Sequence, residues 1–390
     1  MNPKHWVPIA IETLTQLLEI LHHPVFTHWE YACISSYSQL HISLLSVLSM
    51  SPENREAPVI IVGSGPSGLA TAGCLSALSI PYIILEREDN FAPLWTQKSY
   101  DCLHLHLKKQ FCDLPHMPFP SSFPTYVPRK QYIQYLQDYM VHFNISPLYN
   151  RPVIESFHDE AVSKWIVKVK NVISDEVEEY SCRLLVVATG ESSDPLIPEV
   201  EGLDSFAGRV MHSTEYKSGK GLEDKRVLVV GAGTYIDEGD GIHWANDDDV
   251  FEITNSCDRQ NSGDAKLACV WGFEQVWYQE ARGRPLHNED EVLPGIERIR
   301  GNEVFFKDGK SHPFDVIIFA TGFKRTTKMW LKGSDDLLDN DGFAKPCPSY
   351  WKGKNGLYCA GLARRGLSGA KMDGMNIAND IKAMLSQGCP

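Results

Sequence analysis

The sequence lacks the features that mark several specialised classes of protein. It has only 37 Lys and Arg against 50 Asp and Glu among 390 residues, so its net charge is −13. An acidic chain without a basic stripe lacks the electrostatic footprint of a nucleic-acid-binding protein, and it lacks the polybasic cluster that binds an anionic membrane. With 43% hydrophobic and 22% charged residues, it is typical of a globular protein with a large core.

No two cysteines have the CxxC spacing that is typical of a zinc site. The ten cysteines are scattered along the chain, and Glu12 and Glu19 interrupt the place where a secretory signal would need an apolar region. We therefore expect reduced thiols, no bound metal and a cytoplasmic location.

A membrane span is not expected either. Residues 31–52 contain no Lys, Arg, Asp or Glu, but they are rich in serine and include Gln39 and His41. Met50 stands seven residues before the first predicted strand, as a natural start would. We expect residues 1–49 to be an N-terminal extension that is poorly packed and dispensable.

A dinucleotide-binding fingerprint begins at residue 57. Residues 57–62 form a β-branched run, a glycine-rich turn and a helical segment follow, and the apolar run 82–85 ends in Glu86. In this fingerprint the first glycine allows a tight turn, the second lets the backbone approach a pyrophosphate, and the third allows the helix to pack closely on the strand. We predict that Glu86 binds a ribose, and that the pyrophosphate lies against Gly63, Ser64, Gly65, Pro66, Ser67 and Gly68.

A second unit of this kind starts near residue 227 but departs from the pattern. The strand 227–230 leads into Gly231, Ala232 and Gly233, yet Ile236 stands where the third glycine belongs. Residues 237–258 then contain eight acids and no Lys or Arg, without the spacing of a calcium-binding loop. We expect an irregular, solvated loop here, whose charge opposes pyrophosphate binding and weakens the use of NADPH.

Two further strands end in the sequence Ala-Thr-Gly, at 188–190 and at 320–322. Small residues at a strand end allow another chain segment or a nucleotide to approach closely. One such signal follows each glycine-rich unit, which favours a paired nucleotide-binding architecture.

The most specific signal is the pattern FxGxxxHxxx(Y/F)(K/R). It is matched by Phe206, Gly208, His212, Tyr216 and Lys217. From residue chemistry alone we interpret His212 and Tyr216 as buried side chains with structural hydrogen bonds. The pattern itself is the identifying motif of flavin-containing monooxygenases, which this chain therefore resembles.

Within that family the chain resembles the plant YUCCA-type enzymes. The likeness covers about 57–236 and 292–385 and fails over 1–49 and about 237–291. The segments that carry it are Leu94-Trp95, 99–115, 117–120, 123–130, 179–191 and 356–369. The resemblance implies FAD and NADPH as cofactors, and molecular oxygen and indole-3-pyruvate as substrates. The product would be indole-3-acetate, the auxin, formed with loss of carbon dioxide.

The resemblance also assigns roles to individual residues. It places Leu94 and Trp95 near the flavin, and the segment from His106 to Gln110 near the isoalloxazine and nicotinamide. It assigns Gly231, Ala232 and Gly233 to NADPH binding, and it places Arg364 and Arg365 in the flavin domain. From residue chemistry alone, we interpret Arg364 and Arg365 as a solvated pair. We nominate no catalytic acid or base, because flavin and oxygen carry the chemistry.

We therefore predict an α/β fold with two Rossmann-like dinucleotide-binding domains. The FAD-binding domain is discontinuous, at 50–205 and 320–390, and a truncated NADP-binding domain is inserted at 206–319, with 237–291 divergent. Alternatives are an FAD-binding family member with impaired NADPH use, a flavin monooxygenase that oxygenates nitrogen or sulfur, and a non-catalytic protein that retains the scaffold.

Overall fold

The structure is a computed structural model that describes residues 55–231, 266–270 and 291–386. The predicted extension 1–49 and most of the divergent segment 237–291 lie outside the described residues. Within the described part, no helix is both long and apolar enough to cross a membrane, and no cluster of His, Cys, Asp or Glu has a metal-binding arrangement. Among the described residues, Cys74, Cys112, Cys182, Cys347 and Cys359 carry free thiols, whereas Cys102 is disulfide-bonded, so the expectation of reduced thiols is wrong at that position.

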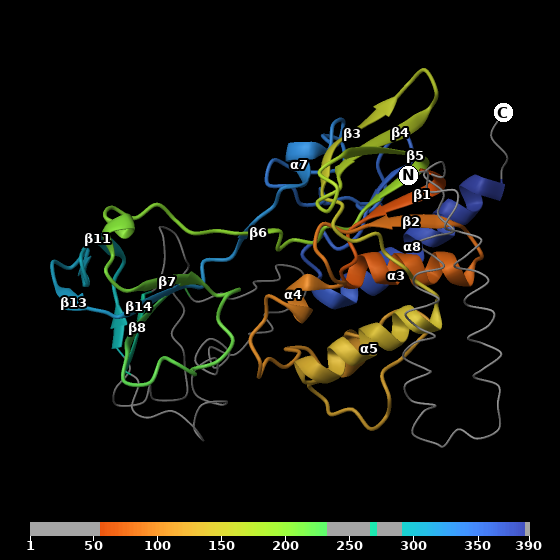
Figure 1. Cartoon of the computed structure of the whole chain (residues 1–390). Coiled ribbons are helices and arrows are strands. Elements are labelled where there is room, and N and C mark those ends of the chain that lie inside the picture. The colour runs from red at the N-terminus through yellow and green to blue at the C-terminus, as the bar shows by residue number, and fades with distance from the viewer. Residues whose placement is uncertain (1–54, 232–265, 271–290, 387–390) are drawn as a thin grey trace, which may run out of the picture. The chain divides into compact units, whose positions relative to one another are not determined.

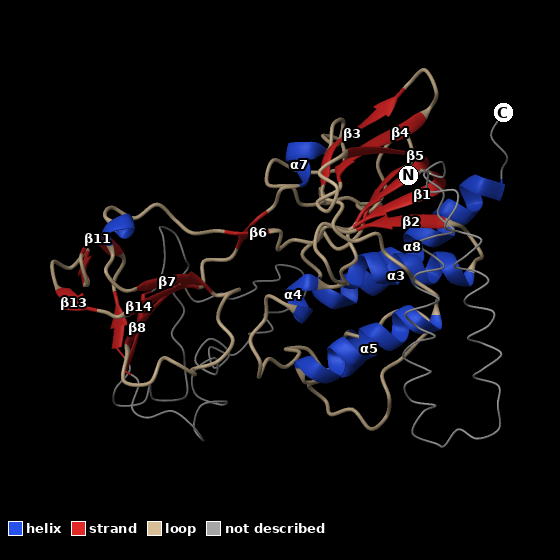
Figure 2. Cartoon of the chain, in the orientation of Figure 1, coloured by secondary structure: helices blue, strands red, loops and turns tan. Residues whose placement is uncertain are grey.

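The first sheet has six strands, of which four are parallel. Strands β2, β1 and β5 run parallel, and β16 pairs with the end of β5 in the same direction. Strands β4 and β3 extend the sheet in antiparallel fashion from β5 (Figure 2). The strands are β1 (Glu56–Val62), β2 (Tyr82–Leu85), β3 (Val153–Asp159), β4 (Lys164–Lys170), β5 (Val177–Val187) and β16 (Leu357–Cys359).

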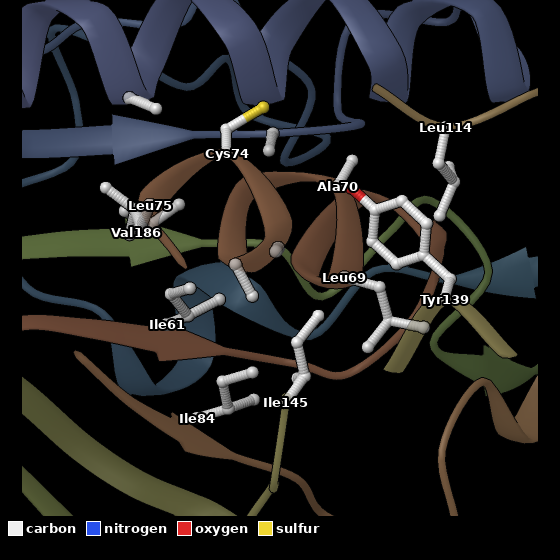
Figure 3. Close-up of a cluster of buried hydrophobic side chains, with 14 of the residues drawn as sticks. Ile61, Leu69, Ala70, Cys74, Leu75, Ile84, Leu114, Tyr139, Ile145 and Val186 are labelled. Carbon is white, nitrogen blue, oxygen red and sulfur yellow. The ribbon is translucent and has the colours of Figure 1, made fainter. Parts of the chain in front are cut away.

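Both faces of this sheet are buried, as a parallel β-branched run predicts. Along β1, Val59 and Ile61 pack into one hydrophobic cluster, while Ile60 and Val62 pack into a second cluster on the opposite face. The first cluster lies under helices α3 (Pro66–Ala77), α5 (Arg129–His142) and α8 (Gly366–Ser386), and Figure 3 shows Leu69 and Leu75 of α3 in it. The glycine-rich turn is thus attached to a rigid core.

Helix α5 packs against α3 through a stripe of buried side chains at helical spacing. The stripe consists of Tyr132, Tyr135, Leu136 and Tyr139. The missing side chain of Gly73 makes room for one of these rings, because a Cβ there would lie 2.1 Å from the Tyr139 hydroxyl. On the other side, α8 runs beside α3 (Figure 1), and a Cβ at Gly374 would lie 2.9 Å from the backbone of Ala70.

The second sheet has five parallel strands in the order β10-β9-β8-β14-β7. They are β7 (Arg209–His212), β8 (Arg226–Val230), β9 (Lys266–Val270), β10 (Glu291–Leu293) and β14 (Val316–Phe319). An antiparallel three-stranded sheet, β11 (Ile296–Arg300), β12 (Glu303–Phe306) and β13 (Ser311–Pro313), contributes to the same hydrophobic cluster as β8 and β14. The predicted α/β fold is confirmed, with one mixed sheet and one parallel sheet.

Two segments of the chain connect the first sheet to the second, and these two segments pair with each other. Strand β6 (Asp194–Pro195) follows β5, strand β15 (Phe323–Lys324) follows β14, and the two form an antiparallel ladder. The remaining short elements are α4 (Pro93–Thr96), η2 (Lys109–Phe111), η3 (Leu203–Ser205) and α7 (Thr327–Trp330).

Candidate functional site

In the glycine-rich turn between β1 and α3, each of the three glycines has a different structural role. Gly63 has φ +106°, and a Cβ there would lie 2.5 Å from the carbonyl oxygen of Ala188, at the end of β5. A Cβ at Gly68 would lie 2.0 Å from the carbonyl oxygen of Gly63. At Gly65, in contrast, a Cβ would meet no atom of the described residues within 4 Å. Gly63 and Gly68 are required by the fold, whereas Gly65 leaves open space for another molecule.

The start of α3 provides amide groups beside that open space. Pro66 occupies the first turn and has no N–H, and the first helical hydrogen bond runs from the Leu69 amide to the Gly65 carbonyl at 2.9 Å. The amides of Ser67 and Gly68 therefore precede the hydrogen-bonded helix, where N–H groups and the helix dipole favour an anion. No acidic residue stands in this first turn. The turn fits the pyrophosphate of a dinucleotide such as FAD.

Glu86 lies at the end of β2, with its carboxylate against the same turn. It is only 5% exposed. One oxygen accepts hydrogen bonds from the Ser64 amide at 2.7 Å and the Ser64 hydroxyl at 2.8 Å, and the other accepts the Glu88 amide at 3.0 Å. The structure thus brings the predicted ribose-binding acid onto the predicted pyrophosphate-binding turn. A carboxylate held in this way also fits ribose hydroxyl donors.

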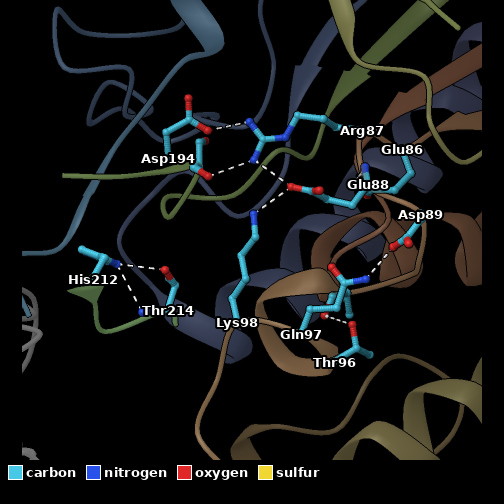
Figure 4. A network of polar contacts seen from close by, with 12 residues as sticks. Glu86, Arg87, Glu88, Asp89, Thr96, Gln97, Lys98, Asp194, His212 and Thr214 are labelled. Carbon is cyan, nitrogen blue, oxygen red and sulfur yellow. Dashed lines mark hydrogen bonds and ion pairs between the residues drawn. The ribbon is translucent and has the colours of Figure 1, made fainter. Parts of the chain in front are cut away.

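The residues after Glu86 join β2 to the segment that leaves the first sheet (Figure 4). Arg87 donates to the Asp194 carboxylate at 2.6 Å and to the Ser193 carbonyl at 2.9 Å. Glu88 pairs with Lys98 at 2.7 Å, just beyond α4. These half-exposed pairs contribute little stability individually, but they fix the relative positions of three segments around the turn.

Leu94 and Trp95 lie on the single-turn helix α4. Its N-cap residue, Ala92, has φ +43°, and the Ala92 amide donates to the Ser64 carbonyl at 3.0 Å, so α4 is attached to the glycine-rich turn. The Trp95 ring stands edge-on to the Tyr132 ring, with 4.7 Å between their centroids. His106 lies on the loop before η2 and Gln110 lies within η2, and both are exposed.

The C-terminal part of the chain returns to the first turn of α3. Gly361 has φ +70°, and a Cβ there would lie 2.1 Å from the Ser67 hydroxyl. The Gly361 amide donates to the Asp373 carboxylate at 2.9 Å, and the Tyr350 hydroxyl donates to the same carboxylate at 2.6 Å. Asp373 is 1% exposed, and burial raises its pKa. This buried acid holds the return loop in contact with the predicted pyrophosphate site.

Sequence reasoning missed Asp373 and Tyr350. The available signal was the helical spacing of α8, where Asp373 falls among Ala370, Gly374 and Ile377 on the buried face. A lone acid on an apolar helix face needs a partner, but nothing in the sequence indicates that the partners are a tyrosine and a backbone amide.

A second glycine has the same setting in the second sheet. Gly231 follows β8 with φ +98°, and a Cβ there would lie 2.7 Å from the carbonyl oxygen of Ala320, at the end of β14. Gly63 stands in the same relation to Ala188 in the first sheet. The two predicted nucleotide-binding turns thus begin alike. Ala232 and Gly233 lie outside the described residues.

His212 has a structural position at the crossing between the sheets. Its Nε2 lies 3.0 Å from the Gly322 carbonyl, and its Nδ1 accepts the Thr214 amide at 3.2 Å (Figure 4). A carbonyl can only accept, so Nε2 carries the proton and the ring is neutral. Burial, the largest effect, lowers the His212 pKa. His212 therefore connects the end of β7 to Gly322, the residue before β15, while Tyr216 is buried in a neighbouring cluster.

Arg364 and Arg365 are exposed, but each has defined neighbours. The Arg364 amide donates to Glu191 at 2.6 Å, and its guanidinium lies 4.0 Å from the centre of the Phe343 ring. The Arg365 guanidinium lies 4.7 Å from the centre of the Tyr350 ring. The pair is thus partly packed on aromatic rings rather than only solvated.

The comparisons with known proteins agree with this arrangement. Residues 60–235 match the family model of pyridine nucleotide-disulphide oxidoreductases. The chain is 37% identical to the probable indole-3-pyruvate monooxygenase YUCCA10 of Arabidopsis thaliana, over 85% of this chain and 98% of that protein. It is 34% identical to the indole-3-pyruvate monooxygenase YUCCA1 of Oryza sativa subsp. japonica, over 84% and 93% of the two chains.

Solved structures show the same fold at lower identity. Tmm from Pelagibacter sp. strain HTCC7211 superposes with a TM-score of 0.67 at 21% identity, covering 85% of this chain and 77% of that one. A flavin-containing monooxygenase from Stenotrophomonas maltophilia gives 0.63 at 22% identity, covering 85% and 99%. By its glycine-rich turns, its motif around His212 and its relatives, the chain belongs to the YUCCA-type indole-3-pyruvate monooxygenase family.

Proposed function

We propose that this protein is an FAD- and NADPH-dependent monooxygenase that converts indole-3-pyruvate to indole-3-acetate. The reaction consumes NADPH, a proton and molecular oxygen, and it yields NADP⁺, water and carbon dioxide. The proposal rests chiefly on 37% identity to a YUCCA enzyme along nearly all of that relative's length. The open space at Gly65, beside the Glu86 carboxylate, is the structural feature that supports it.

The domain assignment belongs to the same proposal. We assign residues 50–205 and 320–390 to FAD binding and residues 206–319 to NADPH binding. In support, the strands of the first sheet come from 56–187 and 357–359, and those of the second come from 209–319. We also propose a cytoplasmic location for the enzyme, which the free thiols of Cys74, Cys112 and Cys359 support.

In the proposed FAD site, each group of residues has its own role in binding. The Ser67 and Gly68 amides bind the pyrophosphate, Glu86 accepts hydrogen bonds from a ribose, and Leu94 and Trp95 face the ring system. When bound, the flavin supplies electron transfer from NADPH to molecular oxygen. The chain contributes orientation and exclusion of water, and no side chain is assigned as a general acid or base.

A second candidate is a flavoprotein that binds FAD but is not reduced efficiently by NADPH. The sequence favours it at one point: Ile236 replaces the third glycine, and eight acids follow within residues 237–258. Unit charges a few ångströms apart repel by about 1 kcal/mol even in water-like surroundings. Three such charges near a phosphate would weaken NADPH binding about a hundredfold, since about 1.4 kcal/mol is tenfold.

Anaerobic reduction separates the two candidates. The purified protein is reconstituted with FAD, and the visible absorbance of the flavin is followed in a stopped-flow instrument as NADPH is added. Rapid bleaching at sub-millimolar NADPH, followed by indole-3-acetate formation on adding oxygen and indole-3-pyruvate, supports the monooxygenase. A flavin that dithionite bleaches but NADPH does not supports the second candidate. A chain that binds no FAD contradicts both.

A further inference from the structure

Lys217, the last residue of the motif around His212, makes contacts that the motif does not explain. Its ammonium donates to the carbonyl oxygens of Gln97, of Ser99 at 3.1 Å and of Thr214 at 3.2 Å. The contact is reciprocal, because the Asp101 amide donates to the Lys217 carbonyl at 2.9 Å. Lys217 precedes β8 of the second sheet, whereas 97–101 follows α4 beside the first sheet. Lys217 therefore connects segments that are more than a hundred residues apart in sequence.

Arg129 at the start of α5 binds the same segment from within the first part of the chain. Its Nε donates to the Trp95 carbonyl at 2.8 Å, and its Nη2 donates to the Thr96 carbonyl at 2.7 Å. It also donates to the Ser99 hydroxyl at 2.7 Å. Together, Lys217 and Arg129 donate hydrogen bonds to the backbone carbonyls of residues 95, 96, 97 and 99.

Three of these carbonyls, those of Trp95, Thr96 and Gln97, are ones that the short helix α4 leaves without intrahelical donors, and Ser99 lies just beyond its end. Helix α4 has four residues and ends at Thr96, and the last carbonyls of any helix lack intrahelical donors. A single turn is unstable by itself, and positive charge at its C-terminal end stabilises it. Lys217 is half-buried at this position, and its burial, together with the nearby Arg129, lowers its pKa.

Hydrophobic packing reinforces the same connection. Tyr100, between Ser99 and Asp101, packs against a buried cluster that includes Met211, Tyr216 and Val227 of the second sheet and its flanking segment. The side chain of Tyr100 and the backbone on either side of it thus contact the second sheet's part of the chain.

We propose that Lys217 is a positioning residue, which sets the placement of α4, and so of Leu94 and Trp95, through the Gln97 and Ser99 carbonyls. In this role it couples the NADPH-binding part of the chain to the segment predicted to face the flavin. The inference rests on the proposed function only for the role of Leu94 and Trp95. The contacts themselves do not depend on it.

The test compares Lys217→Met with Lys217→Arg and with the control Lys220→Met, an exposed lysine three residues along the same segment. The first measurement is amide hydrogen exchange over residues 95–101 in the protein without added cofactor. We expect exchange to be at least tenfold faster in Lys217→Met, near wild type in Lys220→Met, and largely restored in Lys217→Arg. Unchanged exchange in Lys217→Met would overturn the proposal.

The second measurement is flavin reduction in the FAD-reconstituted proteins. Lys217→Met leaves the glycine-rich turn and Glu86 intact, so FAD content and dithionite reduction should match wild type, while reduction at saturating NADPH slows at least tenfold. Equal NADPH rates in wild type and Lys217→Met would contradict the coupling. If NADPH fails to bleach even the wild type, the proposed function fails, and the exchange measurement still decides this inference. If Lys217→Met does not fold, Lys217→Gln, which removes the positive charge, replaces it in both measurements with the same outcomes expected.

Discussion

The Tyr350 hydroxyl and the Asp373 carboxylate lie 2.6 Å apart in the core, where the second carboxylate oxygen receives the Gly361 amide. This relationship joins three distant stretches of the C-terminal part: the loop before β16, the loop after β16, and helix α8. Because Gly361 contacts Ser67 at the start of α3, a change at Asp373 acts on the predicted pyrophosphate site without touching a ligand.

Asp373→Ala should therefore weaken both folding and FAD binding. It leaves the Gly361 amide and the Tyr350 hydroxyl buried without an acceptor, at a cost of about 1–3 kcal/mol for each group. Urea unfolding and a fluorescence titration with FAD measure the two effects. Asp373→Asn keeps an acceptor and should retain most of both properties. An alanine variant with wild-type FAD affinity would show that the loop does not depend on this carboxylate.

Gly65→Ala and Gly68→Ala should fail in different ways. Within the part of the chain that the structure describes, the methyl group of Gly65→Ala meets no atom, and φ is −70°, so the variant should fold normally. It places the methyl where the pyrophosphate would lie, so FAD affinity should fall at least tenfold, or about 1.4 kcal/mol. In Gly68→Ala the methyl would overlap the Gly63 carbonyl, so the melting temperature should fall even without FAD. Full flavin content in Gly65→Ala would refute the site.

Glu86→Gln should weaken FAD binding by about 1.5–3 kcal/mol, the range for hydrogen bonds to a charged group. The amide keeps one acceptor for the Ser64 amide, so the turn itself should persist. Equilibrium dialysis with FAD gives the affinity, and circular dichroism monitors the fold. Glu88→Gln is the matched control, because Glu88 pairs with Lys98 and Arg87 rather than with the turn. Equal losses in both variants would argue against a ribose contact at Glu86.

The His212 imidazole should make stability depend on pH. Its pKa in the folded protein is lowered from the unfolded value of about 6.5, chiefly by burial, although Glu215 nearby acts in the opposite direction. The neutral ring is thus the folded form, so its contribution is present above about pH 6.5 and is lost as the pH falls through the folded value. The stability advantage of wild type over His212→Gln, measured by urea unfolding, should shrink between about pH 7.5 and about pH 5.5. A constant difference would mean that the ring does not titrate in this way.

A chain that begins at Met50 should keep its solubility and its FAD content. The described fold starts with β1 at Glu56, which pairs with β2 and β5 through residues 56–62. Size-exclusion chromatography and the ratio of flavin to protein absorbance test this truncation. Loss of either property would place residues 1–49 within the functional fold.

The local elements were predictable where one segment contains its own signal. The strand predicted at 57–62 is β1 at 56–62, and the apolar run 82–85 is β2. The glycines at 63 and 68 act as the fingerprint requires, because contacts within a βαβ unit are set by residues close in sequence. The strands before the two Ala-Thr-Gly signals are likewise β5 and β14.

The contacts that join distant segments were not predictable. The carbonyl partners of Lys217, and the Tyr350 and Gly361 partners of Asp373, follow from tertiary packing, since a backbone carbonyl or amide carries no sequence signature. The pairing of β6 with β15 involves two residues from each strand, which is too short for hydrophobic alternation to appear. The roles of Leu94, Trp95, His106 and Gln110 stay predictions.

The late position of β16 has a consequence for how the protein is made. Strand β4 covers β5 only as far as Cys182, and β16 pairs with Leu185, Val186 and Val187. Roughly 170 residues separate these partners, so at about 5–20 residues per second a ribosome needs about 10–30 s to deliver the missing strand. During that interval the nascent chain exposes an unpaired edge of β5 at residues that are buried in the folded protein, and such an edge is a template for aggregation. Products that stop before residue 357 should therefore be cleared or aggregate, rather than persist as a folded FAD-binding fragment.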